Sequence, residues 1–361
     1  MSQLVERVLN RYLKGQVDSL DYHKLQRGIS SSETYKVSPT VEGVIPTALA
    51  VTIISDPSLW WKIEQEFAIH SAVGSDSEVP IPHLFDAGFD DLDGRRFAFI
   101  IREFISGRDL DAVLESELIG GFREKDTRDL ATDLGYRLAA LHRHRTSVFG
   151  IMGRASESVH SSWGDFILGE IIRESRFMAE PPSSKYIGSV KVFDILNVLP
   201  SLHKMIEPLQ SSLYEQRSSS LSHGDAHFHN FIAGLNENNS WRIKSMIDME
   251  EALGGDPEID IAFIENWLHF SSYKQDFYRQ KDAFASGYSD IRQIAEHYSG
   301  RRLIYHALRS LSYLRTVFSF DTEEFLRMNP KNSEYVRKHF DILRSLANGY
   351  ALEDLEIYSL V

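Results

Sequence analysis

Two short polar motifs joined by a predicted hairpin constrain this chain more than any other stretch. The first motif, residues 222–230, reads Ser-His-Gly-Asp-Ala-His-Phe-His-Asn, and the second, residues 247–250, reads Ile-Asp-Met-Glu. Between them, apolar runs flank an Asn-rich segment, a pattern that predicts two short strands around a turn. Because a hairpin brings its ends together, we expect Asp225, Asn230 and Asp248 to share one pocket.

The residue types in this predicted pocket suit a hard metal ion and phosphate chemistry. Mg²⁺ prefers oxygen ligands, keeps several of its waters and takes phosphate oxygens. A separate carboxylate can orient a hydroxyl for attack on a phosphoryl group. Two carboxylates and a carboxamide at the ends of one hairpin therefore predict a site for Mg²⁺-dependent phosphoryl transfer.

Three motifs in this order resemble those of the aminoglycoside phosphotransferase and choline-kinase-like small-molecule kinases. They are His223-Gly224-Asp225-x-x-x-x-Asn230, Ile247-Asp248-x-Glu250 and Gly255-Asp256-Pro257-x-x-Asp260. The resemblance implies that Asp225 is the catalytic base and that Asn230 and Asp248 hold Mg²⁺. It also implies that the γ-phosphoryl group of ATP or GTP moves to a hydroxyl of a small acceptor.

The same resemblance implies supporting roles for the remaining motif residues. His223 is expected to be structural and to bond the backbone of its own loop. Asp256 and Asp260 are expected to brace the catalytic loop, and the later of the two also to approach a cationic acceptor. With Glu250 they belong to a run of six acids from Asp248 to Asp260, which would suit an amine-bearing substrate, although charged surface helices look the same in sequence.

The resemblance also implies an α+β fold with the two lobes of a protein kinase. We expect a small lobe with a five-stranded antiparallel sheet at residues 1–103, a hinge at 104–107 and a larger, mostly helical lobe at 108–361. Local patterns agree with this division. Apolar residues recur at helical spacing from Leu4 to Leu13, and Asp93-Gly94 predicts a hairpin turn before a run of apolar residues.

A turn rich in glycine and serine is a candidate for covering the phosphates of the nucleotide. Its members are Gly28, Ser30, Ser31 and Ser32. Backbone N–H groups and hydroxyls are suitable donors for phosphate oxygens. An ordinary polar hairpin loop is the alternative, and the resemblance favours the nucleotide interpretation because the family has a Gly/Ser loop at this place. At the hinge, the backbones of Glu103 and Ile105 are expected to hold the purine edge.

One position departs from the family pattern. In the family, a basic residue on a strand pairs with a glutamate on the following helix and touches the phosphates. Glu66 fits the glutamate, but Thr52 occupies the place of the basic residue. Either Lys36 or Lys62 substitutes for it, or the chain is a catalytically impaired relative that binds a nucleotide or another ligand.

A zinc hydrolase is a second alternative. His223, Asp225, His227 and His229 alternate, so on an extended strand they would face one side and could bind Zn²⁺. Gly224 and Asn230 fit an irregular loop better than a strand, and the zinc hypothesis has no use for Asp248. The resemblance therefore leads to the kinase as the principal hypothesis.

Composition sets limits on the partners and the compartment. The formal net charge is −13 and no basic patch stands out, which disfavours nucleic acid and favours a cationic acceptor. The chain has no cysteine, which excludes disulfides and thiolate chemistry and fits a cytoplasmic protein. The N-terminus lacks the layout of a signal peptide, and no uncharged run approaches the ~20 residues of a membrane span.

Overall fold

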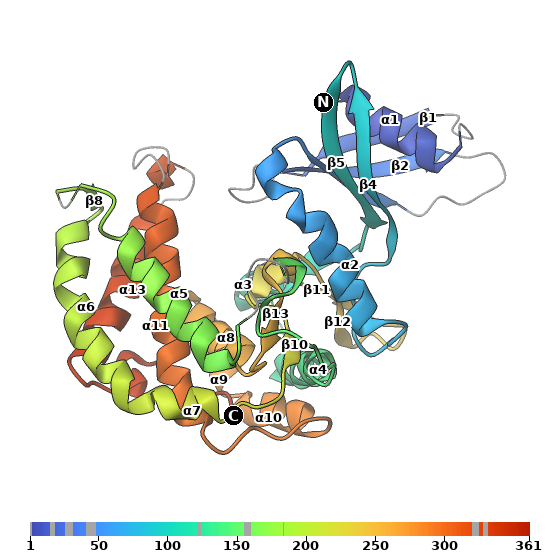
Figure 1. The fold of residues 1–361 in the computed structure, drawn as a ribbon. Coiled ribbons are helices and arrows are strands. Elements are labelled where there is room, and N and C mark those ends of the chain that lie inside the picture. The colour runs from blue at the N-terminus through green and yellow to red at the C-terminus, as the bar shows by residue number, and fades with distance from the viewer. Residues whose placement is uncertain are drawn as a thin grey trace.

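The computed structural model of the protein has two lobes of unequal size (Figure 1). A small lobe holds a β-sheet, and a larger one consists mostly of helices. This arrangement confirms the predicted α+β, two-lobe fold. The structure describes residues 2–14, 19–25, 32–40, 48–120, 124–154, 160–182, 184–319, 325–327 and 331–361.

The sheet of the small lobe is antiparallel and has the strand order β1-β2-β3-β5-β4. Its strands are β1 (Ser19–Lys24), β2 (Glu33–Thr40), β3 (Leu49–Ile54), β4 (Leu84–Leu92) and β5 (Arg95–Glu103). The predicted turn between β4 and β5 forms at Asp93 and Gly94, which both have positive φ angles, +52° and +76°. Such angles suit the twist of a two-residue hairpin.

Two helices cover opposite faces of this sheet. Helix α1 (Ser2–Tyr12) packs Val5 and Val8 against one face, together with the odd-numbered apolar residues of β3 and β5. Helix α2 (Trp61–Val73) packs Ile63 against the other face, which carries Ile54 and Ile100. The face of each side chain follows from the alternation along a strand.

Helix α2 is also tied to the large lobe. The side chain of Gln65, which is 1% exposed, donates from Nε2 to the carbonyl oxygen of Ala252 at 3.0 Å and accepts from the N–H of Gly153. One turn earlier, Lys62 Nζ lies 2.5 Å from Glu250 Oε2. The helix therefore belongs to the small lobe by packing and to both lobes by its polar contacts.

The large lobe contains most of the helices of the described chain. They are α3 (Leu110–Gly120), α4 (Glu124–His142), α5 (Trp163–Phe177), α6 (Val192–Ile206), α7 (Gln210–Tyr214), α8 (Ile259–Phe270), α9 (Lys274–Tyr278), α10 (Lys281–Ser289), α11 (Tyr298–Ser319) and α13 (Asn332–Ala347). Two apolar clusters form their cores, and none of these helices combines the length and apolar character that a membrane crossing requires.

The large lobe also contains short strands. They are β6 (Arg108–Asp109), β7 (Gly150–Ile151), β8 (Tyr186–Ile187), β9 (Val190–Lys191), β10 (Ser220–Ser222), β11 (Phe231–Leu235), β12 (Trp241–Met246) and β13 (Leu253–Gly255). Strands β11 and β12 form the predicted hairpin around the Asn-rich turn, and β6 adds to its other edge. The segment that leaves the small lobe is thereby joined to the hairpin.

Candidate active site

The loop that carries Asp225 follows β10 and is irregular, as its glycine predicts. Gly224 has a φ angle of +78°, and a Cβ at this position would lie 1.8 Å from the carbonyl oxygen of Glu251. Any side chain here would therefore meet the backbone and also strain the φ angle. Further along, the N–H of His227 donates to the carbonyl oxygen of Asp225 at 2.9 Å, and a 3₁₀ turn follows at Phe228–Asn230.

Asp260 braces this loop from the first turn of α8. It is fully buried, and its carboxylate accepts from the N–H groups of His223, at 2.6 Å, and Gly224, at 2.9 Å. The Nε2 of His142 lies 3.0 Å from the same carboxylate. Burial lowers the pKa of His142 despite this carboxylate. The imidazole of His223 contacts the carbonyl oxygen of Ile247 at 2.9 Å, so the two motifs are also joined directly.

Asp225 lies against a cation that the sequence did not suggest. Arg309 on α11 donates from Nη2 to Asp225 Oδ1 at 2.6 Å, and Nε2 of His227 lies 3.3 Å from Oδ2. Burial acts to raise the pKa of Asp225, but Arg309 and His227 outweigh it and hold the pKa below its ordinary value. The side chain keeps 25% exposure. An ionised carboxylate is therefore presented at the surface of the loop.

Asn230 and Asp248 flank the open end of the hairpin, where the N–H of Ile247 donates to the carbonyl oxygen of Asn230 at 2.9 Å. The side-chain nitrogen of Asn230 contacts the carbonyl oxygen of Asp225 at 3.0 Å and Nε2 of His227 at 3.2 Å. These contacts use the nitrogen and leave the amide oxygen without a hydrogen-bond partner in the described part of the chain.

Asp248 is exposed and has a left-handed backbone, with φ +62° and ψ +47°. Its carboxylate makes no hydrogen bond or ion pair with any described residue. A non-glycine residue in this region is uncommon and is often found at functional sites. An unpaired carboxylate and a free amide oxygen, from the two segments that meet at the open end of the hairpin, are oxygen donors of the kind that Mg²⁺ prefers, so these two residues could hold that ion.

Glu250, two residues after Asp248, faces the small lobe and pairs with Lys62. Burial and the neighbouring carboxylate of Asp248 raise the pKa of Glu250, and Lys62 opposes them. Lys62 is therefore engaged with an acid of the large lobe. The other lysine expected to replace the strand cation, Lys36, lies with Nζ 4.4 Å from the centre of the Phe104 ring.

The partner of Glu66 is an arginine that the sequence analysis did not select. Oε1 of Glu66 lies 3.4 Å from Nε of Arg102, at the end of β5, and 3.5 Å from Nε2 of His70. Burial acts to raise the pKa of Glu66, but Arg102 and His70 lower it overall. Thr52 contacts Thr34 through their hydroxyl oxygens, 3.0 Å apart.

The predicted nucleotide contacts at the hinge and the Gly/Ser turn are placed only in part. Glu103 is the last residue of β5, and its N–H donates to the carbonyl oxygen of His83 at 2.9 Å. Ile105 lies in the segment that joins β5 to β6, and its N–H has no partner among the described residues. Ser32 directly precedes β2. The positions Gly28, Ser30 and Ser31 lie outside the described residues.

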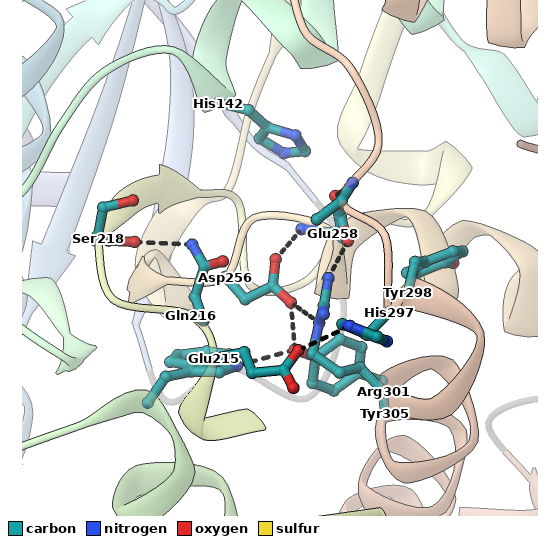
Figure 2. Close-up of polar contacts among 12 residues, drawn as sticks. His142, Glu215, Gln216, Ser218, Asp256, Glu258, His297, Tyr298, Arg301 and Tyr305 are labelled. Carbon is teal, nitrogen blue, oxygen red and sulfur yellow. Dashed lines mark hydrogen bonds and ion pairs between the residues drawn. The ribbon is translucent and has the colours of Figure 1, made fainter. Parts of the chain in front are cut away.

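A buried ionic cluster supports the start of α8 (Figure 2). Nε of Arg301 lies 2.5 Å from Asp256 Oδ2, its Nη2 pairs with Glu258, and the hydroxyl of Tyr305 donates to Asp256 at 2.5 Å. Asp256 and Glu258 are fully buried and Arg301 is 2% exposed. Asp256 is therefore a buried member of a structural ionic cluster.

This cluster predicts a pH dependence of stability. Burial and the charge of Asp256 raise the pKa of Glu258 from 4.5 to about 7. Because an unfolded glutamate binds fewer protons in this window, the free energy of unfolding should fall as the pH rises from 4.5 to 7, by at most about 1.4 kcal/mol per pH unit. Urea unfolding of the wild type and Glu258→Gln at pH 5 and pH 7 measures this dependence. The wild type should lose stability relative to the variant at the higher pH, and an unchanged difference would contradict the assignment.

The zinc alternative does not fit the observed loop. Its histidines needed an extended strand, whereas a 3₁₀ turn occupies 228–230. His227 instead stacks on Trp267 with ring centres 4.9 Å apart. Within the described ranges, the one group of three such side chains whose ligand atoms lie within 4.8 Å of one another is Asp109, Asp111 and His229, which shares only His229 with the predicted set.

Comparisons with known proteins agree with this architecture. The sequence model of the phosphotransferase enzyme family matches residues 24–297. The chain is similar to the structure of a thermostable mutant of an aminoglycoside phosphotransferase in a ternary complex with ADP and hygromycin B, at 17% identity, covering 96% of this chain and 99% of that one with a TM-score of 0.64. It is also similar to spectinomycin phosphotransferase in complex with ADP and spectinomycin, at 15% identity, covering 94% and 98% with a TM-score of 0.53. A search of the curated proteins gave no match. At these identities the structural likeness shows the fold alone, and that fold is the one that the motifs predicted.

Proposed function

Because this chain belongs to the phosphotransferase enzyme family, we propose that it is a small-molecule kinase that transfers the γ-phosphoryl group of ATP or GTP to a hydroxyl of a small acceptor. The observation that carries the proposal is the hairpin geometry. It places Asn230 in contact with Asp225 and beside Ile247, the neighbour of Asp248. The carboxylate proposed as catalytic and the two proposed oxygen ligands thus come from the loop and the strand end that meet at one end of the hairpin.

Asp225 would orient the acceptor hydroxyl and accept its proton. Against the effect of burial, Arg309 and His227 hold the pKa of this carboxyl low, so it stays ionised and can accept a hydrogen bond from the hydroxyl. Asn230 and Asp248 would hold Mg²⁺, which when bound supplies neutralisation of phosphate charge. Catalysis would then rest mainly on positioning and on electrostatic stabilisation.

The acceptor would be a small polar molecule with a free hydroxyl, which can also be cationic. Carboxylates of Asp109 and Asp111, at the junction of β6 and α3, lie 3.1 and 3.7 Å from ring nitrogens of His229, within the loop that carries Asp225. Trp267 adds an aromatic face against His227 and His229. Carboxylates and an aromatic ring around the histidines of the Asp225 loop suit a molecule with hydroxyl or amino groups, and the structural neighbours were solved with hygromycin B and with spectinomycin.

Dependence on a divalent cation tests the proposal. Titration calorimetry with ATP and with GTP, each with Mg²⁺ and with EDTA, should show nucleotide binding that requires the metal. In a separate turnover assay, addition of a suitable acceptor should lead to formation of ADP or GDP. Asp248→Asn should raise the Mg²⁺ concentration needed for nucleotide binding by at least about tenfold, because one anionic ligand is lost.

The matched control is Glu237→Gln, which removes an exposed acid from the opposite end of the same hairpin and should leave the Mg²⁺ requirement unchanged. Equal Mg²⁺ dependence of wild type and Asp248→Asn would contradict the metal assignment. Absence of binding by the wild type to either nucleotide would contradict the kinase itself.

A further inference from the structure

The pairing register of the small-lobe sheet shows which basic residues share a sheet face with Thr52. Ala50 on β3 pairs with Lys36 on β2 and with Arg102 on β5. Paired residues of antiparallel strands project to the same face, and so do residues two apart along one strand. Thr52 therefore shares its face with both Lys36 and Arg102.

This face is the one that α2 covers. Ile54 and Ile100, which have the same parity along their strands as Thr52 and Arg102, pack against Ile63 of α2. Glu66, almost one turn after Ile63, contacts Nε of Arg102 at 3.4 Å. The carboxylate on the helix is thus paired with a cation from the same sheet face, but from the neighbouring strand and not from β3.

The two lysines on or near this face have other partners. Lys36 lies over the ring of Phe104, and Lys62 pairs with Glu250. Within the described part of the chain, Arg102 contacts a carboxylate through Nε alone, and its side chain is 22% exposed. Its two terminal nitrogens remain available as donors, and a guanidinium can present them in parallel to phosphate oxygens.

Arg102 is also linked through α2 to the segment that carries the proposed metal ligand Asp248. Its partner Glu66 lies one turn after Lys62 on α2, and Lys62 pairs with Glu250, two residues after Asp248. A cation at this place would meet the phosphates of a nucleotide whose metal is held by Asp248. Three features of Arg102 therefore suit a phosphate contact. It lies on the sheet face that α2 covers, it pairs with Glu66, and its two terminal nitrogens have no partner among the described residues.

We propose that Arg102 supplies from β5 the phosphate-binding cation that Thr52 does not supply from β3, with Glu66 as the carboxylate that orients it. This inference rests on the proposed kinase function. In this proposal Arg102 binds the phosphates of the nucleotide, and Glu66 positions Arg102. It replaces the hypothesis that the threonine at position 52 leaves the protein unable to hold phosphates.

Titration calorimetry with Mg·ADP and Mg·GDP, and with adenosine and guanosine, tests the inference. Arg102→Met should weaken binding of the preferred nucleotide by about ten- to hundredfold, the range for a lost charged hydrogen bond, while the nucleoside affinity stays unchanged. Arg95→Met removes an exposed arginine from the other end of the same strand and should alter neither affinity. Arg102→Met/Thr52→Lys should recover most of the nucleotide affinity, because it returns a cation to the same face from β3.

The outcomes separate this inference from the proposed function. If the wild type binds neither nucleotide, the kinase proposal fails. If the wild type binds and Arg102→Met binds the nucleotide equally well, the kinase remains and the role of Arg102 is wrong. An equal loss of nucleoside and nucleotide affinity in Arg102→Met, with no recovery in the double variant, would show that Arg102 is only structural. If Arg102→Met does not fold, Arg102→Gln replaces it in the same titrations.

Discussion

Asp225→Ala should lower the rate of phosphoryl transfer by about 10²- to 10⁴-fold while leaving nucleotide affinity within about twofold, because the side chain acts on the acceptor and not on the donor. Single-turnover measurements with the preferred nucleotide would report the transfer rate, and calorimetry would report the affinity. Since Asp225 is the partner of Arg309, the variant also leaves an unpaired cation at the loop. The affinity measurement therefore serves as the check that the loop still holds the nucleotide.

Asp91→Ala is a suitable control for Asp225→Ala, because Asp91 is an exposed acid near the end of β4. Its rate and affinity should equal those of the wild type. A variant at position 225 that transfers phosphate at the full rate would refute the role of its carboxylate. A simultaneous collapse of nucleotide affinity would instead place Asp225 in the donor site.

Arg301→Met should have the largest effect on stability. The substitution leaves Asp256 and Glu258 buried without their shared cation, and loss of one partner from a buried ion pair costs about 3–5 kcal/mol. Denaturant unfolding followed by circular dichroism measures the loss. The destabilisation should shrink at low pH, where protonation removes the charge from the unpaired carboxyls.

A surface pair provides the comparison for Arg301. Arg344 pairs with Asp341 on the exposed side of α13, and its side chain is 57% exposed. Arg344→Met should cost less than about 1 kcal/mol, because exposed ion pairs are screened by water. Equal costs for the two arginines would mean that burial of the cluster does not determine its contribution to stability.

The parts of the fold that were predictable from sequence depend on local patterns. The hairpin of β11 and β12, the turn at Asp93-Gly94 and helix α1 follow from turn chemistry and apolar periodicity within short windows. The two-lobe fold was not predicted in this way, because it was implied by the resemblance of the ordered motifs to a known family. The predicted lobe limits coincide with the end of β5 at Glu103 and the start of β6, and they stay predictions.

The residues that sequence reasoning missed act across long separations. Arg309 meets Asp225 from 84 positions downstream, and His142 meets Asp260 across 118 positions. Nothing in the sequence around Arg309 or His142 indicates which residue each one contacts. Arg102 was missed for another reason: the expected cation belongs to one strand, and only the pairing register shows that the next strand reaches the same face.

The double contact of Gln65 has a consequence for how the molecule could be controlled. An outward swing of α2 would break the two buried hydrogen bonds that this side chain makes with the backbone of Ala252 and Gly153. Such a swing is energetically unfavourable, so movement of α2 is poorly suited to regulating the protein. If the chain is the kinase proposed above, α2 would already hold its position before a nucleotide binds, and the concentrations of the two substrates would set the rate.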